Sequence, residues 1–136
     1  MSKFYTKLDA KIGQHMHNDK FERICILNHS LHYHSDFLGK IIVVPKGFVS
    51  DGASVPRALW NVYPPFGRYL EAAIVHDWYC VLGQKGESPI DYKDAAEVFK
   101  EAMKVCGVSW WRRNKMYWAV RLGGPKFQAR QKPNKD

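Results

Sequence analysis

An imidazole and a carboxylate stand next to each other inside an otherwise apolar segment, AAIVHDWYC, which spans residues 72–80. His76 can exchange a proton near neutral pH, and Asp77 beside it could orient the ring or share a metal ion with it. An apolar segment is typical of a buried helix, and a buried carboxylate is costly unless it is paired or hydrogen-bonded. The sequence therefore predicts that another part of the chain supplies a partner for Asp77.

A polar stretch earlier in the chain, SDGASVPR at residues 50–57, could supply that partner. Its last residue, Arg57, could bind the Asp77 carboxylate through two parallel hydrogen bonds. Asp51 and Ser54 are its other functional side chains, although such residues commonly bond backbone N–H groups of their own turn. We expect the loop and the helix to gather one polar cluster: Asp51, Ser54, Arg57, His76 and Asp77.

Three interpretations of this cluster stay open. In a hydrolytic site, His76 would act as a general base with Asp77, and Ser54 and Arg57 would complete the catalytic set. In a metal site, a divalent cation would be held by Asp51, His76 and Asp77. In a structural cluster, the same groups would lock the loop to the helix. The structural interpretation is preferred because no nucleophile is evident.

The second half of the chain reads as helices. Residues 69–82 are apolar nearly all round, so this helix should be buried nearly all round and end at Gly83. Successive residues lie about 100° apart on a helix, so His76 and Asp77 should point to different neighbours. Asp91 is the expected N-cap of a second helix that ends at Gly107. A third helix should begin after Ser109 and end at residues 123–125, Gly-Gly-Pro.

The first half reads as strands. Residues 21–33 alternate and contain a continuous apolar run, which indicates a central strand. Residues 41–44 form a short β-branched strand that stops at Pro45, and a glycine-rich loop follows. The expected fold is α+β: a small antiparallel sheet in the N-terminal half packed with about three α-helices in the C-terminal half. Residues 1–125 should form a single domain, and residues 126–136 a basic, flexible tail.

Positive charge is concentrated at the C-terminal end. Eight of the 21 basic residues and one of the 13 acidic residues lie at or beyond residue 109, which gives this segment +7 of the net charge of +8. Such asymmetry favours contact with nucleic acid, an acidic partner or a membrane surface, although a solvated face would look the same. The candidate partner surface comprises Arg112, Arg113, Lys115, Lys126, Arg130 and Lys132.

The same segment, WWRRNKMYWAVR, interleaves aromatic and basic residues, a mixture that can grip single-stranded nucleic acid by stacking. Packing of Trp110, Trp111 and Trp118 on two sides of the helix is the simpler explanation, and no nucleic-acid fold motif accompanies the segment. We therefore expect the tryptophans to pack and the cations to face solvent.

Other features exclude several classes of protein. Three cysteines without a C-x-x-C pair indicate neither a disulfide framework nor a thiolate zinc site. His32 and His34 share one face of an extended segment, but surface imidazoles explain them better than a metal does. No apolar run is long enough to span a bilayer and no signal peptide is recognisable, so secretion is not expected.

Four ordered motifs give the sequence a family resemblance: VPKGFVSDGASVPRALW, AAIVHDWYC, AAEVFKEAMKVCGV and WWRRNKMYWAVRLGG. Over roughly residues 40–124 the chain resembles a family of small tailed-phage and prophage proteins of unknown function. The resemblance implies a virus-encoded protein found in the host cytoplasm or in the virion. It also puts weight on Asp51, Ser54, Pro56, Arg57, His76 and Asp77. The family pattern has an acidic residue three positions before Phe99, where this chain has Ala96 with Asp94 nearby.

These observations rank three functions. The first is a phage accessory or virion-associated protein of the tail or of assembly, with phage structural proteins or a host protein as partners and nucleic acid as a further partner of the basic C-terminus. The second is a His/Asp-site hydrolase, metal-assisted if a divalent cation is bound, used in lysis or host takeover. The third is a host-directed binding protein.

Overall fold

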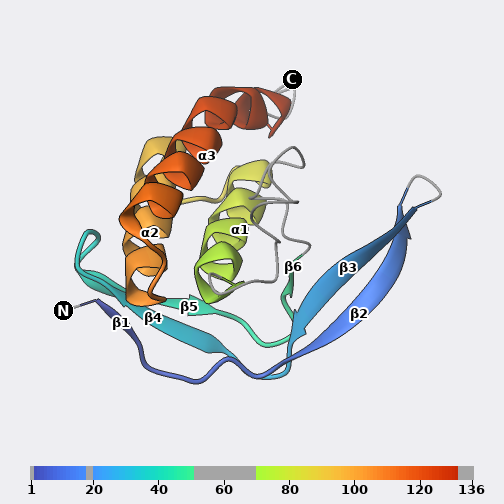
Figure 1. Ribbon diagram of the computed structural model, residues 1–136. Coiled ribbons are helices and arrows are strands. Elements are labelled where there is room, and N and C mark those ends of the chain that lie inside the picture. Colours follow the sequence, from blue (N-terminus) through green and yellow to red (C-terminus); the bar gives the residue numbers. More distant parts are fainter. Residues whose placement is uncertain (1, 18–19, 51–69, 132–136) are drawn as a thin grey trace.

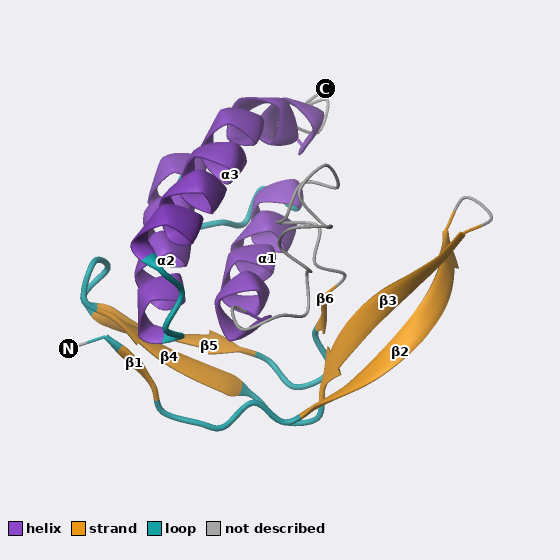
Figure 2. Cartoon of the chain, in the orientation of Figure 1, coloured by secondary structure: helices purple, strands orange, loops and turns teal. Residues whose placement is uncertain are grey.

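The computed structural model describes residues 2–17, 20–50 and 70–131, without the side chains of residues 12–24, 84 and 123–131. Strands come first and helices follow, so the expected α+β fold is confirmed (Figures 1 and 2). In chain order, the elements are β1 (Lys3–Phe4), β2 (Ala10–His17), β3 (Lys20–Leu27), β4 (Leu31–Ser35), β5 (Lys40–Val44), β6 (Val49–Ser50), α1 (Leu70–Gln84), α2 (Tyr92–Val105) and α3 (Trp110–Gln131).

The strands form two antiparallel sheets, ordered β1-β4-β5 and β2-β3-β6. In Figure 1, β2 and β3 make a long ribbon that projects away from the helices. The prediction of one strand over residues 21–33 was wrong, because the chain leaves β3 at Leu27 and enters the other sheet at Leu31. Asn28 holds this break: its backbone N–H donates to Asp9 O at 2.8 Å and its Nδ2 donates to Asp9 Oδ1 at 2.9 Å.

The sheet β1-β4-β5 supplies one side of the core. In β4 the alternation of side chains buries Leu31, Tyr33 and Ser35, and in β5 it buries Ile42 and Val44. Leu31 lies opposite Val44, and Tyr33 lies opposite Ile42, so the buried residues meet on one face. α1 and α2 contact these strands and close the core.

The second helix follows its sequence signals closely. Asp91 adopts an extended backbone and its Oδ1 accepts from Asp94 N at 2.8 Å, which confirms the predicted N-cap. Gly107 has a φ of +82°, and it ends the helical segment as predicted. α1 departs from the prediction, because it runs through Gly83 to Gln84, and the glycine with the left-handed backbone is Gly86, at φ +72°.

α3 is longer than predicted. It begins after Ser109 as predicted, and Ser109 caps it: Ser109 O accepts from Arg113 N at 2.9 Å, and Ser109 Oγ accepts from Arg112 N at 3.5 Å. The predicted end at residues 123–125 was wrong, because the helix continues across both glycines and Pro125 to Gln131. Helix propensity is a local preference that surrounding structure can override. The backbone at 126–131 is helical, and the flexibility predicted for residues 126–136 stays a prediction.

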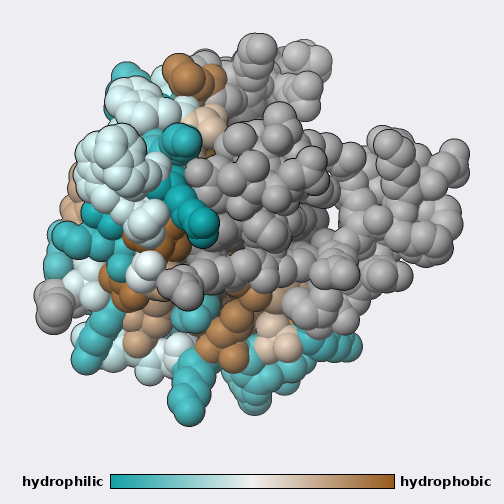
Figure 3. All heavy atoms as spheres, viewed as in Figure 1, coloured by the Kyte–Doolittle hydropathy of each residue, from teal (hydrophilic) through white to brown (hydrophobic). Residues whose placement is uncertain are grey.

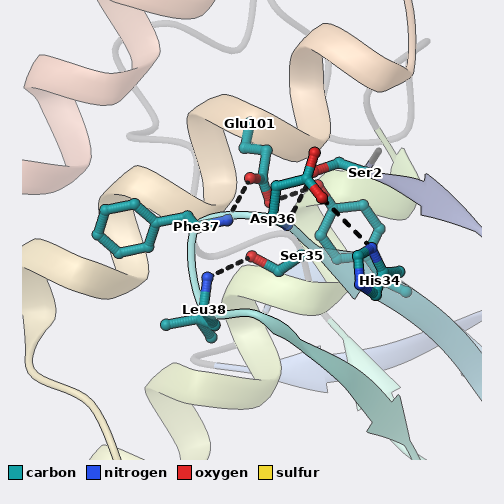
Figure 4. Close-up of polar contacts among 8 residues, drawn as sticks. Ser2, His34, Ser35, Asp36, Phe37, Leu38 and Glu101 are labelled. Carbon is teal, nitrogen blue, oxygen red and sulfur yellow. Dashed lines mark hydrogen bonds and ion pairs between the residues drawn. The ribbon is translucent and has the colours of Figure 1, made fainter.

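A carboxylate on α2 anchors the turn between β4 and β5 (Figure 4). Tyr33 Oη donates to Glu101 Oε1 at 2.7 Å, and the backbone N–H of Phe37 donates to Glu101 Oε2 at 2.9 Å. Ser35 Oγ accepts from Leu38 N at 3.1 Å in the same turn. Burial, followed by the hydrogen bond to Glu101, raises the pKa of Tyr33 well above its ordinary value. Glu101 therefore links α2 to the sheet through two donors.

Replacing Glu101 by alanine is expected to lower the free energy of unfolding by about 1–2 kcal/mol, because the buried ring of Tyr33 loses its hydroxyl partner while solvent partly replaces the bonds. Urea unfolding of the wild type and the variant measures the difference. Glu87→Ala is the matched control: Glu87 is an exposed acid outside the helices, and its loss should cost less than about 0.5 kcal/mol. Equal effects of the two substitutions would contradict the anchoring role.

Candidate functional site

α1 carries the His-Asp pair into the centre of the protein. Residues 72–77 of this helix are all buried, as the apolar pattern predicted. His76 is 7% exposed and Asp77 is 5% exposed. Within the described part of the chain, the buried polar residues are Ser35, Ser50, His76 and Asp77. The burial predicted for this helix therefore holds for both polar side chains.

Asp77 meets a serine of the second sheet. Ser50 Oγ donates a hydrogen bond to Asp77 Oδ2, and both side chains are buried. Ser50 is the last residue of β6 and lies opposite Cys25 of β3. The hydrogen bond therefore ties α1 to the sheet β2-β3-β6. It also supplies the partner that a buried carboxylate requires.

His76 points to a different neighbour. Its imidazole packs on the ring of Phe99 in α2, with centroids 4.9 Å apart and planes inclined by 30°. Its Nδ1 lies 3.6 Å from Cys80 Sγ, one turn further along α1. Burial lowers the pKa of His76 to about 4, so the ring is neutral at pH 7. Among the described contacts, the imidazole is held by an aromatic ring and a thiol.

The arrangement allows His76 to accept a proton, but it favours a structural role for the His-Asp pair. A neutral imidazole can accept a proton, as a general base must. The described contacts send His76 toward α2 and Asp77 toward β6, which favours a role in holding helix and sheet together. Asp51, Ser54 and Arg57 lie outside the described residues, so their membership of the cluster stays a prediction. No group of three or more His, Cys, Asp or Glu side chains in the described part of the chain could hold a metal ion.

Sequence reasoning missed Ser50, Phe99 and Cys80 as neighbours of the pair. Cys80 could have been found, because it follows His76 by four residues and so lies one turn along the helix. Ser50 immediately precedes the candidate Asp51, but only the pairing of β6 with β3 directs its hydroxyl inward. Phe99 lies on another helix, and no local pattern joins it to His76.

The acidic position of the family pattern is buried here. Ala96 is fully buried on α2, three residues before Phe99. Asp94 lies partly exposed in the first turn of that helix, where its N–H bonds to the Asp91 cap. A negative charge in the first turn is favoured by the helix dipole, which accounts for an acid at this position. The described contacts give Asp94 no link to His76.

The histidines of the strand region pair with nearby acids. His29 Nε2 lies 3.2 Å from Asp9 Oδ2, and both side chains are more than half exposed. His34 Nδ1 lies 3.6 Å from Asp36 Oδ1. His32 and His34, for which surface positions were predicted, are both partly exposed.

The candidate basic surface is partly described. Arg112 and Lys115 are exposed, and Arg113 donates from Nη1 to Val108 O at 3.1 Å. The side chains of Lys126, Arg130 and Lys132 lie outside the described residues. The prediction that the tryptophans of α3 pack was wrong, because Trp110, Trp111 and Trp118 are all more than half exposed. The inner face of the helix is occupied by other residues, including Met116 and Tyr117.

The cysteines are free, as the sequence predicted. Burial is the main cause that raises the pKa of Cys106 to about 11, so its thiol stays protonated at neutral pH. Cys25 is fully buried, and burial raises its pKa also. None of the described helices combines the length and the apolar character that crossing a bilayer requires.

Comparison with known proteins identifies a family and two similar proteins. Residues 25–120 match the family described as a protein of unknown function (DUF1353). Two uncharacterized proteins of Sinorhizobium fredii are similar. One, y4jT, is 35% identical over 65% of this chain and 26% of its own length, and the other, y4iH, is 30% identical over 57% and 31%. The chain thus spans between a quarter and a third of these relatives. No solved structure matches.

Proposed function

The chain belongs to the DUF1353 family, and from that premise we propose that it is an accessory or virion-associated assembly protein of a bacteriophage or prophage. The viral setting is supported by the resemblance of its four ordered motifs. The assembly role is supported by one contrast in the geometry. Ser50, His76 and Asp77 are buried in the core, whereas α3 offers exposed aromatic and basic side chains for docking.

In this proposal His76 and Asp77 hold the protein together. Asp77 binds β6 through Ser50, and His76 packs on Phe99 of α2, so the pair joins three elements at the centre of the core. A buried polar network of this kind favours one arrangement of its elements over others. Helices and sheet held together in this way, with exposed aromatic and basic side chains on α3, suit a component of a larger assembly.

Mass spectrometry of purified particles tests the proposal. Particles are collected by density gradient from a culture that produces the phage or prophage encoding this chain. The chain is expected to comigrate with the major capsid and tail proteins at a constant ratio across the gradient, while an abundant host cytosolic protein serves as the control for carry-over. Recovery of the chain only in the particle-free fraction would contradict a virion-associated role.

A hydrolase is the second candidate, and the neutral imidazole of His76 is the observation that favours it. With its pKa lowered to about 4, His76 is available as a proton acceptor at pH 7. Release of soluble fragments from peptidoglycan sacculi by the purified chain, with and without a divalent cation, would test this role in lysis. Activity that His76→Leu abolishes would support it, and equal activity of the two proteins would remove His76 from the catalytic role.

A further inference from the structure

The outward face of α3 carries a regular stripe of large side chains. Trp111, Lys115, Trp118 and Leu122 follow one another at i, i+4, i+7 and i+11, the spacing of a single helix face. All four are exposed, Trp111 by 71% and Leu122 by 75%. Met116 and Tyr117 are buried on the opposite side, where α3 packs on α2 and α1. We call the four exposed residues the α3 stripe.

Cations are mixed with the aromatic rings on this face. Lys115 lies between the two tryptophans of the α3 stripe, and Arg112 beside it is exposed. The Arg121 guanidinium lies 5.5 Å from the centroid of the Trp118 ring. Over α3, Figure 3 shows pale side chains of intermediate hydropathy alternating with teal hydrophilic ones. The 22 residues of α3 include six Lys and Arg and no Asp or Glu. The face is therefore aromatic and uniformly positive.

These properties discriminate among the occupants that such a face could take. A second copy of the chain would bring two uniformly positive helices together, which like-charge repulsion disfavours. A helix that lies in a membrane interface segregates its apolar face from its cations, whereas here Lys115 stands in the middle of the apolar stripe. Tryptophan is enriched in protein–protein interfaces but lysine is depleted from them, and here a lysine occupies the centre of the stripe.

We propose that the α3 stripe binds single-stranded nucleic acid. Trp111 and Trp118 would stack on bases, and Lys115 and Arg112 would neutralise the phosphates that join them. Seven residues of helix separate the two tryptophans by about 10 Å along the axis, which leaves room for a backbone segment over Lys115. The inference deepens the docking role of α3 in the proposed function and rests on it.

Fluorescence anisotropy with the full chain tests this inference. The probe is a labelled oligothymidylate of about 20 nucleotides, compared with a duplex of the same length. The wild type is expected to bind the single strand more tightly than the duplex. Trp111→Ala and Trp118→Ala should each weaken binding by about 5- to 150-fold, because each removes one stacking platform. Lys115→Gln should reduce the dependence of log affinity on log salt by about 0.7, the contribution of one phosphate on a single strand.

Phe37→Ala is the matched control. Phe37 is an exposed aromatic residue of the β4–β5 turn, 49% accessible, and Figure 4 shows its ring directed away from the polar contacts there. Its loss should leave the affinity for the oligonucleotide unchanged. Melting curves of all variants should coincide with the wild type, because each substituted side chain is exposed. Quenching of tryptophan fluorescence by the unlabelled oligonucleotide gives a second measurement on the unmodified chain.

Three results would overturn the inference: no binding of the single strand, equal affinity for single strand and duplex, or tryptophan variants that bind as well as the wild type. Binding to vesicles of anionic phospholipid without binding to the oligonucleotide would also overturn it and assign the α3 stripe to a membrane surface. Particle association is measured separately. A packaged chain that does not bind the oligonucleotide would refute this inference alone, whereas a chain that binds it but is absent from particles would refute the proposed function.

Discussion

Replacing Ser50 by alanine is expected to lower the free energy of unfolding by about 1.5–3 kcal/mol, the range for a hydrogen bond to a charged group. The substitution removes one oxygen from the protein but leaves the Asp77 carboxylate buried with one donor fewer. The cost therefore comes mainly from the acid that remains. Urea unfolding monitored by circular dichroism at neutral pH measures the change.

A double-mutant cycle separates this interaction from general damage to the core. When Asp77→Ala is combined with Ser50→Ala, the loss should be smaller than the sum of the two single losses by about 1–2 kcal/mol, because each single substitution already removes the hydrogen bond between them. Ser35→Ala provides the matched control. Ser35 is equally buried but bonds to Leu38 N in another part of the fold, so its effect should add to that of Asp77→Ala. Additive losses for Ser50 and Asp77 would contradict the described hydrogen bond.

His76 should make the protein lose stability in acid. Its pKa is 6.5 in an ordinary environment and about 4 in the folded protein, so the unfolded chain binds the proton more readily. The contribution of His76 to stability is therefore fully present above pH 6.5, declines as the pH falls toward about 4, and then levels off. The whole effect amounts to about 3 kcal/mol, at about 1.4 kcal/mol for each pH unit between the two pKa values.

Substitution of His76 by leucine removes this titration and keeps an apolar side chain against Phe99. The difference in unfolding free energy between wild type and variant is expected to change by about 3 kcal/mol between ~pH 7 and ~pH 4, in favour of the variant at the acid end. His29→Gln is the matched control, since it removes an exposed histidine and keeps the buried imidazole of His76 in place. Equal pH dependence of wild type and His76→Leu would contradict the burial of the imidazole.

The positions of the helices and the burial of the pair could be predicted from local pattern. Apolar residues occupy every face of the helix around residues 72–77. No face is left for solvent, so the two polar side chains must lie in the core. Asp91 indicated where α2 begins, because a carboxylate at the N-cap accepts a hydrogen bond from the free N–H of Asp94. Such signals act within one turn of helix, which is why they are readable in a single sequence.

The partners of the pair depend on contacts that local pattern does not encode. Ser50 and Asp77 are 27 residues apart, and their meeting requires β6 to pair with β3. β2 was also not predicted, because it is stabilised by pairing with β3 rather than by the strand preference of its own residues. Its sequence, AKIGQHMH, contains glycine and lysine and has a low preference for strands, but all eight residues pair with β3.

The exposure of the tryptophans of α3 could have been predicted from their spacing along the helix. The sequence interpretation assigned Trp111 and Trp118 to packing, but both share a helix face with the charged Lys115. Met116 follows Trp111 by five residues, which places it about 140° round the helix on the packed side. A strict count of helical angles would therefore have placed these rings on the solvent side.

The NMR titration of the His76 imidazole tests the central claim most directly, because it measures the environment of that one ring. Ring nitrogen and carbon shifts of the wild type are followed from ~pH 8 down to the acid limit of folding, and His76 is assigned by comparison with His76→Leu. The buried position predicts a ring that stays neutral until about pH 4. A midpoint for His76 near 6.5 in the folded protein would place the imidazole in water and contradict the account.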